Sequence, residues 1–174
     1  YQSKIGYCMG IGLDSIKIKW LTICIALKVD NYGGEVKKSV GGLGGHTSID
    51  AIIDKWIVTL EIFPINFQLF HKIDLNIGLE TSRLINEDYK GNGYDYLMGR
   101  YSRYFNLQDT NFVYSPKTFI GLSGRISYDF NLSRSLTISP QYSYYYGLLD
   151  ELQGFLQDTK SMRHYFFIVI KKRI

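Results

Sequence analysis

The sequence lacks any long apolar run. Its longest apolar stretches, Ile23 to Leu27 and Tyr165 to Ile170, are only as long as one β-strand, whereas a membrane helix needs roughly 18 apolar residues. Mean hydropathy is −0.09. These values exclude a bundle of membrane helices. They do not exclude a chain that crosses a membrane with strands, because only every second residue of such a strand faces lipid.

The net charge is small, and the sequence has few histidines and cysteines. The formal net charge is +4, and no stripe of basic residues is interleaved with aromatic ones, so nucleic acid is not an expected partner. His46, His71 and His164 share no spacing typical of metal ligands, which predicts no metal and no other cofactor. Ser161 with His164 is the only nearby pair that resembles a nucleophile and its base. The sequence therefore favours a protein that is not an enzyme.

Alternation of apolar and polar residues is the main positive signal. It runs through residues 4–14, 17–30, 72–85, 118–130 and 135–148, which predicts strands there. Residues 55–70 alternate too, but the phase slips by one residue at Phe63-Pro64, which predicts a β-bulge. Residues 164–174, apolar on both faces through much of their length, form the last predicted strand. The chain is thus expected to be all-β with about seven strands.

The expected links between these strands differ in length. They are short near Asp14-Ser15, at His71 and over 131–134, and long over 31–54, 86–116 and 149–163. Alternating short periplasmic turns and long external loops are typical of small up-and-down antiparallel outer-membrane barrels. Aromatic residues gather near both strand ends, as at two membrane interfaces. They are Trp20, Phe67, Phe70, Tyr128 and Phe130 near the short turns, and Trp56, Tyr144 and Tyr146 near the long links.

These signals predict one domain over residues 1–174, a transmembrane β-barrel of the bacterial outer membrane. One set of residues should face lipid and the alternate set the lumen. The lipid-facing set includes Ile23, Ile25, Leu75, Ile77, Leu122 and Tyr142, and the lumen set includes Thr22, Asp74, Asn76, Arg125 and Gln141. Alternation alone leaves open a soluble lipocalin-like barrel, whose apolar face would turn inward.

Charged residues of the polar face are expected to pair with one another. The interior of a barrel of about eight strands is just filled by side chains, and charges buried there need partners. The predicted lumen network consists of Lys28, Glu61, Asp74, Glu80, Arg125 and Asp129. Such a network predicts a plugged barrel rather than a conducting pore.

Two further expectations concern the start of the chain. Cys8 and Cys24 have lumen parity on strands joined by a short turn, so a disulfide between them is left open for an exported protein. The strand at 4–14 runs toward a short turn, and bacterial single-chain barrels have an even number of strands. We therefore expect one upward strand and one external loop before Tyr1.

Several segments carry a family resemblance. They include Leu60-Glu61-Ile62-Phe63-Pro64, the strand from Ile73 to Leu79, the segment from Gly121 to Tyr128, the segment from Tyr142 to Tyr144, and Gly147-Leu148. In these segments the chain resembles the PorT-like outer-membrane β-barrel proteins of Bacteroidetes, although Phe63 adds a residue before Pro64. The resemblance implies an outer-membrane location and no single activity.

The expected function is that of a non-enzymatic barrel, either structural or an accessory subunit of a larger outer-membrane assembly. Its expected partners are outer-membrane lipid, lipopolysaccharide and other outer-membrane proteins. One alternative is an enzyme that modifies lipid A. Another is a barrel whose external loops bind a ligand, because tyrosine favours recognition surfaces. Tyrosines in or beside one long link are Tyr89, Tyr94, Tyr96, Tyr101, Tyr104 and Tyr114.

Overall fold

The protein is all-β. The computed structural model describes residues 2–18, 21–42, 44–70, 72–97, 101–106, 113–154 and 159–172. Within these ranges seven long strands follow one another in the sheet: β1 (Gln2–Ile18), β2 (Leu21–Gly42), β3 (Gly45–Leu69), β4 (Ile73–Leu97), β7 (Thr118–Tyr128), β9 (Leu136–Gly154) and β10 (Thr159–Lys172). Three short strands join this sheet: β5 (Tyr101–Asn106) on β4, and β6 (Val113–Tyr114) and β8 (Phe130–Asn131) on β9. Over these ranges no helix has the length and apolar character needed to span a membrane.

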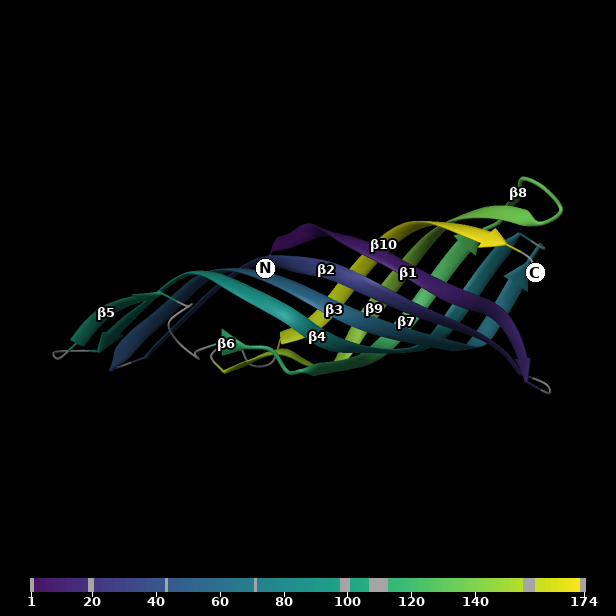
Figure 1. Cartoon of the computed structure of the whole chain (residues 1–174). Helices are drawn as coiled ribbons and strands as arrows, with labels where there is room; N and C mark the ends of the chain where they lie inside the picture. The colour runs from purple at the N-terminus through teal and green to yellow at the C-terminus, as the bar shows by residue number, and fades with distance from the viewer. Residues whose placement is uncertain are drawn as a thin grey trace.

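The long strands run up and down, each antiparallel to its neighbours, in a sheet curled into a half-barrel (Figure 1). This confirms the predicted all-β, up-and-down fold class. In the described residues the strand order ends at β1 on one side and at β10 on the other. These end strands point the same way along the sheet, so direct pairing between them would be parallel. The further strand expected before Tyr1 stays a prediction.

The two faces of the sheet have opposite character. Ile77 and Leu122 are exposed on the convex face, where Ile23, Leu75 and similar side chains also lie. Asn76, by contrast, is only 5% exposed on the concave face. Gln141 is buried there too, and Asp74 and Arg125 are half-buried, while the side chain of Thr22 is outside the described set. The alternative in which the apolar face turns inward is therefore wrong.

The phase slip at Phe63-Pro64 is a β-bulge, as predicted. The register between β3 and β4 shifts between Ile62 and Ile65, and Phe63 stays buried while Ile62 and Ile65 are both exposed. Gly78 lies opposite this irregularity on β4. A Cβ at Gly78 would be 2.0 Å from the carbonyl oxygen of Ile62, so only glycine lets the two backbones approach this closely.

The first hairpin differs from the prediction. β1 continues past the expected turn at Asp14-Ser15 to Ile18, and the ladder absorbs these residues in an irregularity between Leu13 and Ile16. The apolar pairing resumes beyond it and continues to Ile18 opposite Leu21, and residues 19–20 lie outside the described residues. Because of this displacement Cys8 faces Asp30 rather than Cys24, and neither cysteine is in a disulfide.

Much of the expected long links is also strand, which corrects the prediction of loops. β2 and β3 pair without interruption to Gly42 and Gly45, β4 continues to Leu97, and β9 and β10 extend to Gly154 and from Thr159. β3 alone has 25 residues, against about 9–11 in a strand that spans a membrane. We call residues 31–42, 45–57, 86–97 and 101–106 the extension. It reaches far beyond β7 and β10 and ends at β5 (Figure 1).

Candidate functional site

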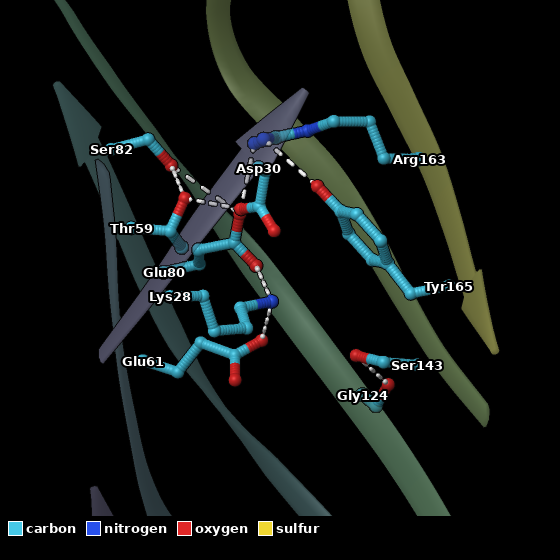
Figure 2. A network of polar contacts seen from close by, with 10 residues as sticks. All are labelled: Lys28, Asp30, Thr59, Glu61, Glu80, Ser82, Gly124, Ser143, Arg163 and Tyr165. Carbon is cyan, nitrogen blue, oxygen red and sulfur yellow. Dashed lines mark hydrogen bonds and ion pairs between the residues drawn. The ribbon is translucent and has the colours of Figure 1, made fainter. Parts of the chain in front are cut away.

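The concave face carries a buried network of charged side chains (Figure 2). Lys28 on β2 points inward because it alternates with the exposed Leu27 and Val29. Its Nζ lies 2.7 Å from Oε1 of Glu61 on β3 and 4.0 Å from Oε2 of Glu80 on β4. Glu80 also pairs with Arg163 of β10, whose Nη2 is 2.9 Å from Oε1. Two carboxylates thus face two cations from four different strands.

Neutral side chains extend this network along the same face. Thr59 donates a hydrogen bond of 2.7 Å to Asp30 and lies 3.0 Å from the hydroxyl of Ser82. Ser82 in turn donates to Glu80 over 3.4 Å. Arg163 donates to the hydroxyl of Tyr165 over 3.2 Å. The alternation places each of these groups at an inward position. Thr59 therefore bonds across strands to Asp30 and Ser82, while Ser82 and Arg163 bond along their own strands.

Aromatic rings close the interior around the cations. The Nζ atom of Lys28 is 4.4 Å from the ring centre of Tyr165, and the guanidinium of Arg163 is 3.7 Å from that of Tyr145. Lys55, which is buried, lies 5.3 Å from the ring centre of Phe119. Side chains of β2 therefore meet those of β10 although the two strands lie near opposite ends of the sheet order. Around these residues the interior is occupied by side chains.

A second polar cluster lies nearer the short-turn end. Nζ of Lys171 is 3.0 Å from Asp129 and 3.4 Å from Asp74. Asp129 also accepts a hydrogen bond from Ser139. The guanidinium of Arg125 lies 4.4 Å from the ring centre of Phe63. The structure thus distributes the predicted lumen residues over two ion-paired clusters and one cation–aromatic contact.

Sequence reasoning missed Arg163 and Lys171 as network members. Arg163 fell in the range expected to be a loop, and Lys171 in a strand that reads as apolar on both faces. Their common parity was the available signal, because Ser161, Arg163, Tyr165 and Lys171 are all odd-numbered and turn inward. For Ser161 and Arg163 that parity has meaning only because β10 begins as early as Thr159.

The two described histidines, His46 and His164, do not form a reactive site with their neighbours. Ser161 is buried on the concave face, whereas His164, three positions along the same strand, is exposed on the convex face and contacts the Tyr142 hydroxyl over 2.7 Å. The pair singled out as nucleophile and base is therefore split between two faces. His46 lies 3.3 Å from the Ser39 hydroxyl, and His71 is outside the described residues. Among the residues that the structure describes, no cluster of His, Cys, Asp or Glu is placed to hold a metal ion.

Taken with the fold, these contacts define a class: a curled antiparallel sheet with an apolar convex face and an ion-paired concave one. No family model, curated protein or solved structure matches the chain. The resemblance to PorT-like proteins therefore stays a prediction.

Proposed function

We propose that the chain is an integral β-barrel protein of a bacterial outer membrane. The observation that carries the proposal is the inverted polarity of the sheet. Lys28, Glu61 and Glu80 are buried on the concave face, while leucine and isoleucine side chains are exposed on the convex face. Water around the convex face would leave this apolar surface exposed, and patches of this kind mark contact with a membrane or partner. Lipid around the convex face removes the free-energy cost of exposing these apolar side chains to water.

The dimensions of the apolar band support a membrane crossing. On β4 the convex face is apolar from Ile73 to Leu79 and the small Thr81 follows, so the stretch from 73 to 81 is about the length of a strand that spans a bilayer. Aromatic side chains lie near both ends of the band, where amphipathic rings are favoured. Exposed examples are Phe67, Phe70 and Phe130 near the short turns and Trp56 and Tyr146 toward the extension.

The role that fits best is non-enzymatic, as a structural or accessory subunit of an outer-membrane assembly. The ionised groups inside the barrel are engaged with one another, and the Ser161–His164 pair is split between faces. In outer-membrane barrels the short turns face the periplasm, which would direct the extension outward from the cell. Lipopolysaccharide and neighbouring membrane proteins are then its natural contacts, and a PorT-like relationship in Bacteroidetes remains part of the proposal.

Membrane fractionation tests this proposal. The chain is expressed with a bacterial export signal, and inner and outer membranes are separated by density. We expect the protein in the outer-membrane fraction, and we expect the unheated sample to migrate differently from the boiled one on a denaturing gel, as folded barrels do. The same chain without the export signal is the control. Recovery of the exported protein as a folded, water-soluble species would refute the proposal.

A further inference from the structure

The convex side of the extension is polar and aromatic, unlike the convex side of the lipid-facing band. Cross-strand register aligns its side chains in rows from β2 through β5. One row contains Ser39, Ser48, Tyr94 and Tyr104, and the adjacent row contains Lys37, Asp50, Asn92 and Asn106. Cross-strand partners project from the same face of a sheet, so both rows form one continuous surface.

This surface is hollowed between the two rows. A depression of about 350 Å³ is lined by side chains that include Ser39, Ser48, Asp50, Tyr94 and Tyr104. The two tyrosine rings form one wall, with their centres 4.8 Å apart and their planes tilted by 44°. Small serine side chains stand beside them on β2 and β3. The depression therefore results from large aromatic residues next to small hydroxylated ones within a single row.

Exposure and charge limit what this depression can bind. Tyr104 is 81% exposed, although aromatic rings are usually covered. Lys37 is paired with Glu35 at 2.8 Å and with Asp50 at 3.2 Å. The hydrogen bonds to Glu35 and Asp50 raise the pKa of Lys37, so its ammonium group is charged at neutral pH. Lys38 also lines the depression, but Asp50 within it and Glu35 beside it balance the two lysine charges, so the site does not select for a polyanion.

We propose that this depression binds a neutral oligosaccharide, with a sugar ring against Tyr94 and Tyr104 and its hydroxyl groups toward the serines, Asn92 and Asp50. A pyranose ring has an apolar C–H face and a polar edge. The negatively charged face of an aromatic ring suits the first, and amide, hydroxyl and carboxylate groups suit the second. The inference rests on the proposed function, because that function would direct the extension toward the cell exterior, where such glycans occur.

Calorimetric titration of the detergent-folded full chain tests the proposal. The probes are maltohexaose, cellohexaose and chitohexaose, with heparin as a polyanionic comparison. We expect at least one neutral hexasaccharide to bind and heparin to bind no better than it. Tyr104→Ala should weaken that binding at least tenfold, and Tyr104→Trp should retain it because the aromatic surface remains.

Tyr7→Ala is the matched control, since Tyr7 is 79% exposed but lies outside the depression. It should leave affinity unchanged. Ser48→Leu should block binding by filling the depression while both tyrosines stay in place. Absence of binding to all neutral probes, equal loss in the Tyr7 and Tyr104 variants, or stronger binding of heparin would each overturn the inference.

The outer-membrane proposal and the saccharide proposal can each be refuted while the other stands. A chain that fractionates with the outer membrane but ignores the sugars retains the proposed function alone. A chain that self-associates through this face, with Tyr104→Ala abolishing the association and no sugar competing for it, also overturns the saccharide site. A detergent-folded chain can be titrated even if fractionation places it outside the outer membrane.

Discussion

An arginine placed on the convex face distinguishes a membrane-facing surface from a water-facing one. Ile77 lies in the middle of the apolar band on β4 and is 52% exposed. Ile52 lies on the convex face of the extension and is 50% exposed. The two side chains have the same chemistry, the same exposure and the same kind of secondary structure. They differ in whether the proposed membrane surrounds them.

The expected cost of Ile77→Arg follows from this difference. At the bilayer midplane, arginine on the lipid face of a barrel destabilises it by about 2–4 kcal/mol, which is roughly 30- to 1000-fold in the folding equilibrium. An exposed substitution in water usually changes stability by about 0.5 kcal/mol or less. We therefore expect Ile77→Arg to be strongly destabilising and Ile52→Arg to be close to neutral.

Equilibrium unfolding in urea, with each variant refolded into phospholipid vesicles, measures both costs. The fraction folded is read from the difference in gel mobility between unheated and boiled samples. The reasoning is refuted if Ile77→Arg lowers the free energy of unfolding no more than Ile52→Arg does. It is also refuted if neither variant changes that free energy, in vesicles or in water.

Other predictions follow from individual contacts. Lys28→Met should destabilise the folded barrel by about 3–5 kcal/mol because it removes a partner of buried carboxylates, and adding Glu61→Gln should recover part of that loss in the same urea experiment. Gly78→Ala should cost about 1–3 kcal/mol through overpacking at the bulge; a neutral effect would contradict the close backbone approach. Gly12→Cys with Ala26→Cys, in a chain whose native cysteines are replaced by serine, should form a disulfide detectable on a non-reducing gel, because a Cβ at Gly12 would lie 3.4 Å from that of Ala26. Mass spectra of lipid A should be identical in cells with and without the protein, and a new lipid A species would contradict the non-enzymatic role.

Some features were readable from the sequence because they depend on neighbours along the chain. Period-2 alternation fixes which side chains share a face, so the separation of Ile77 from Asn76 could be predicted, as could the slip at Phe63-Pro64. The prediction of a turn at Asp14-Ser15 was wrong, because it too was based only on residues that are neighbours along the chain. Turn-forming residues are also tolerated within a strand irregularity, and only the partner strand decides between the two.

The sequence predicted the lumen network only in part. Parity identified Lys28, Glu61 and Glu80 as inward-facing, but it could not say which of them meet. That depends on the register between strands and on the curl of the sheet, which brings Arg163 from β10 to Glu80 on β4. Such contacts join residues far apart in the chain, and no local pattern encodes their distance.

The sequence by itself determined the all-β class, the alternation of the two faces and the bulge, because each follows from local backbone geometry. Tertiary structure alone decided that the polar face is the concave one, since alternation is the same whichever way a sheet curls. It also decided that much of the expected loop sequence is strand. Residues such as Val36 and Ile49 are buried there, and pairing with neighbouring strands satisfies backbone groups that isolated segments would leave to water.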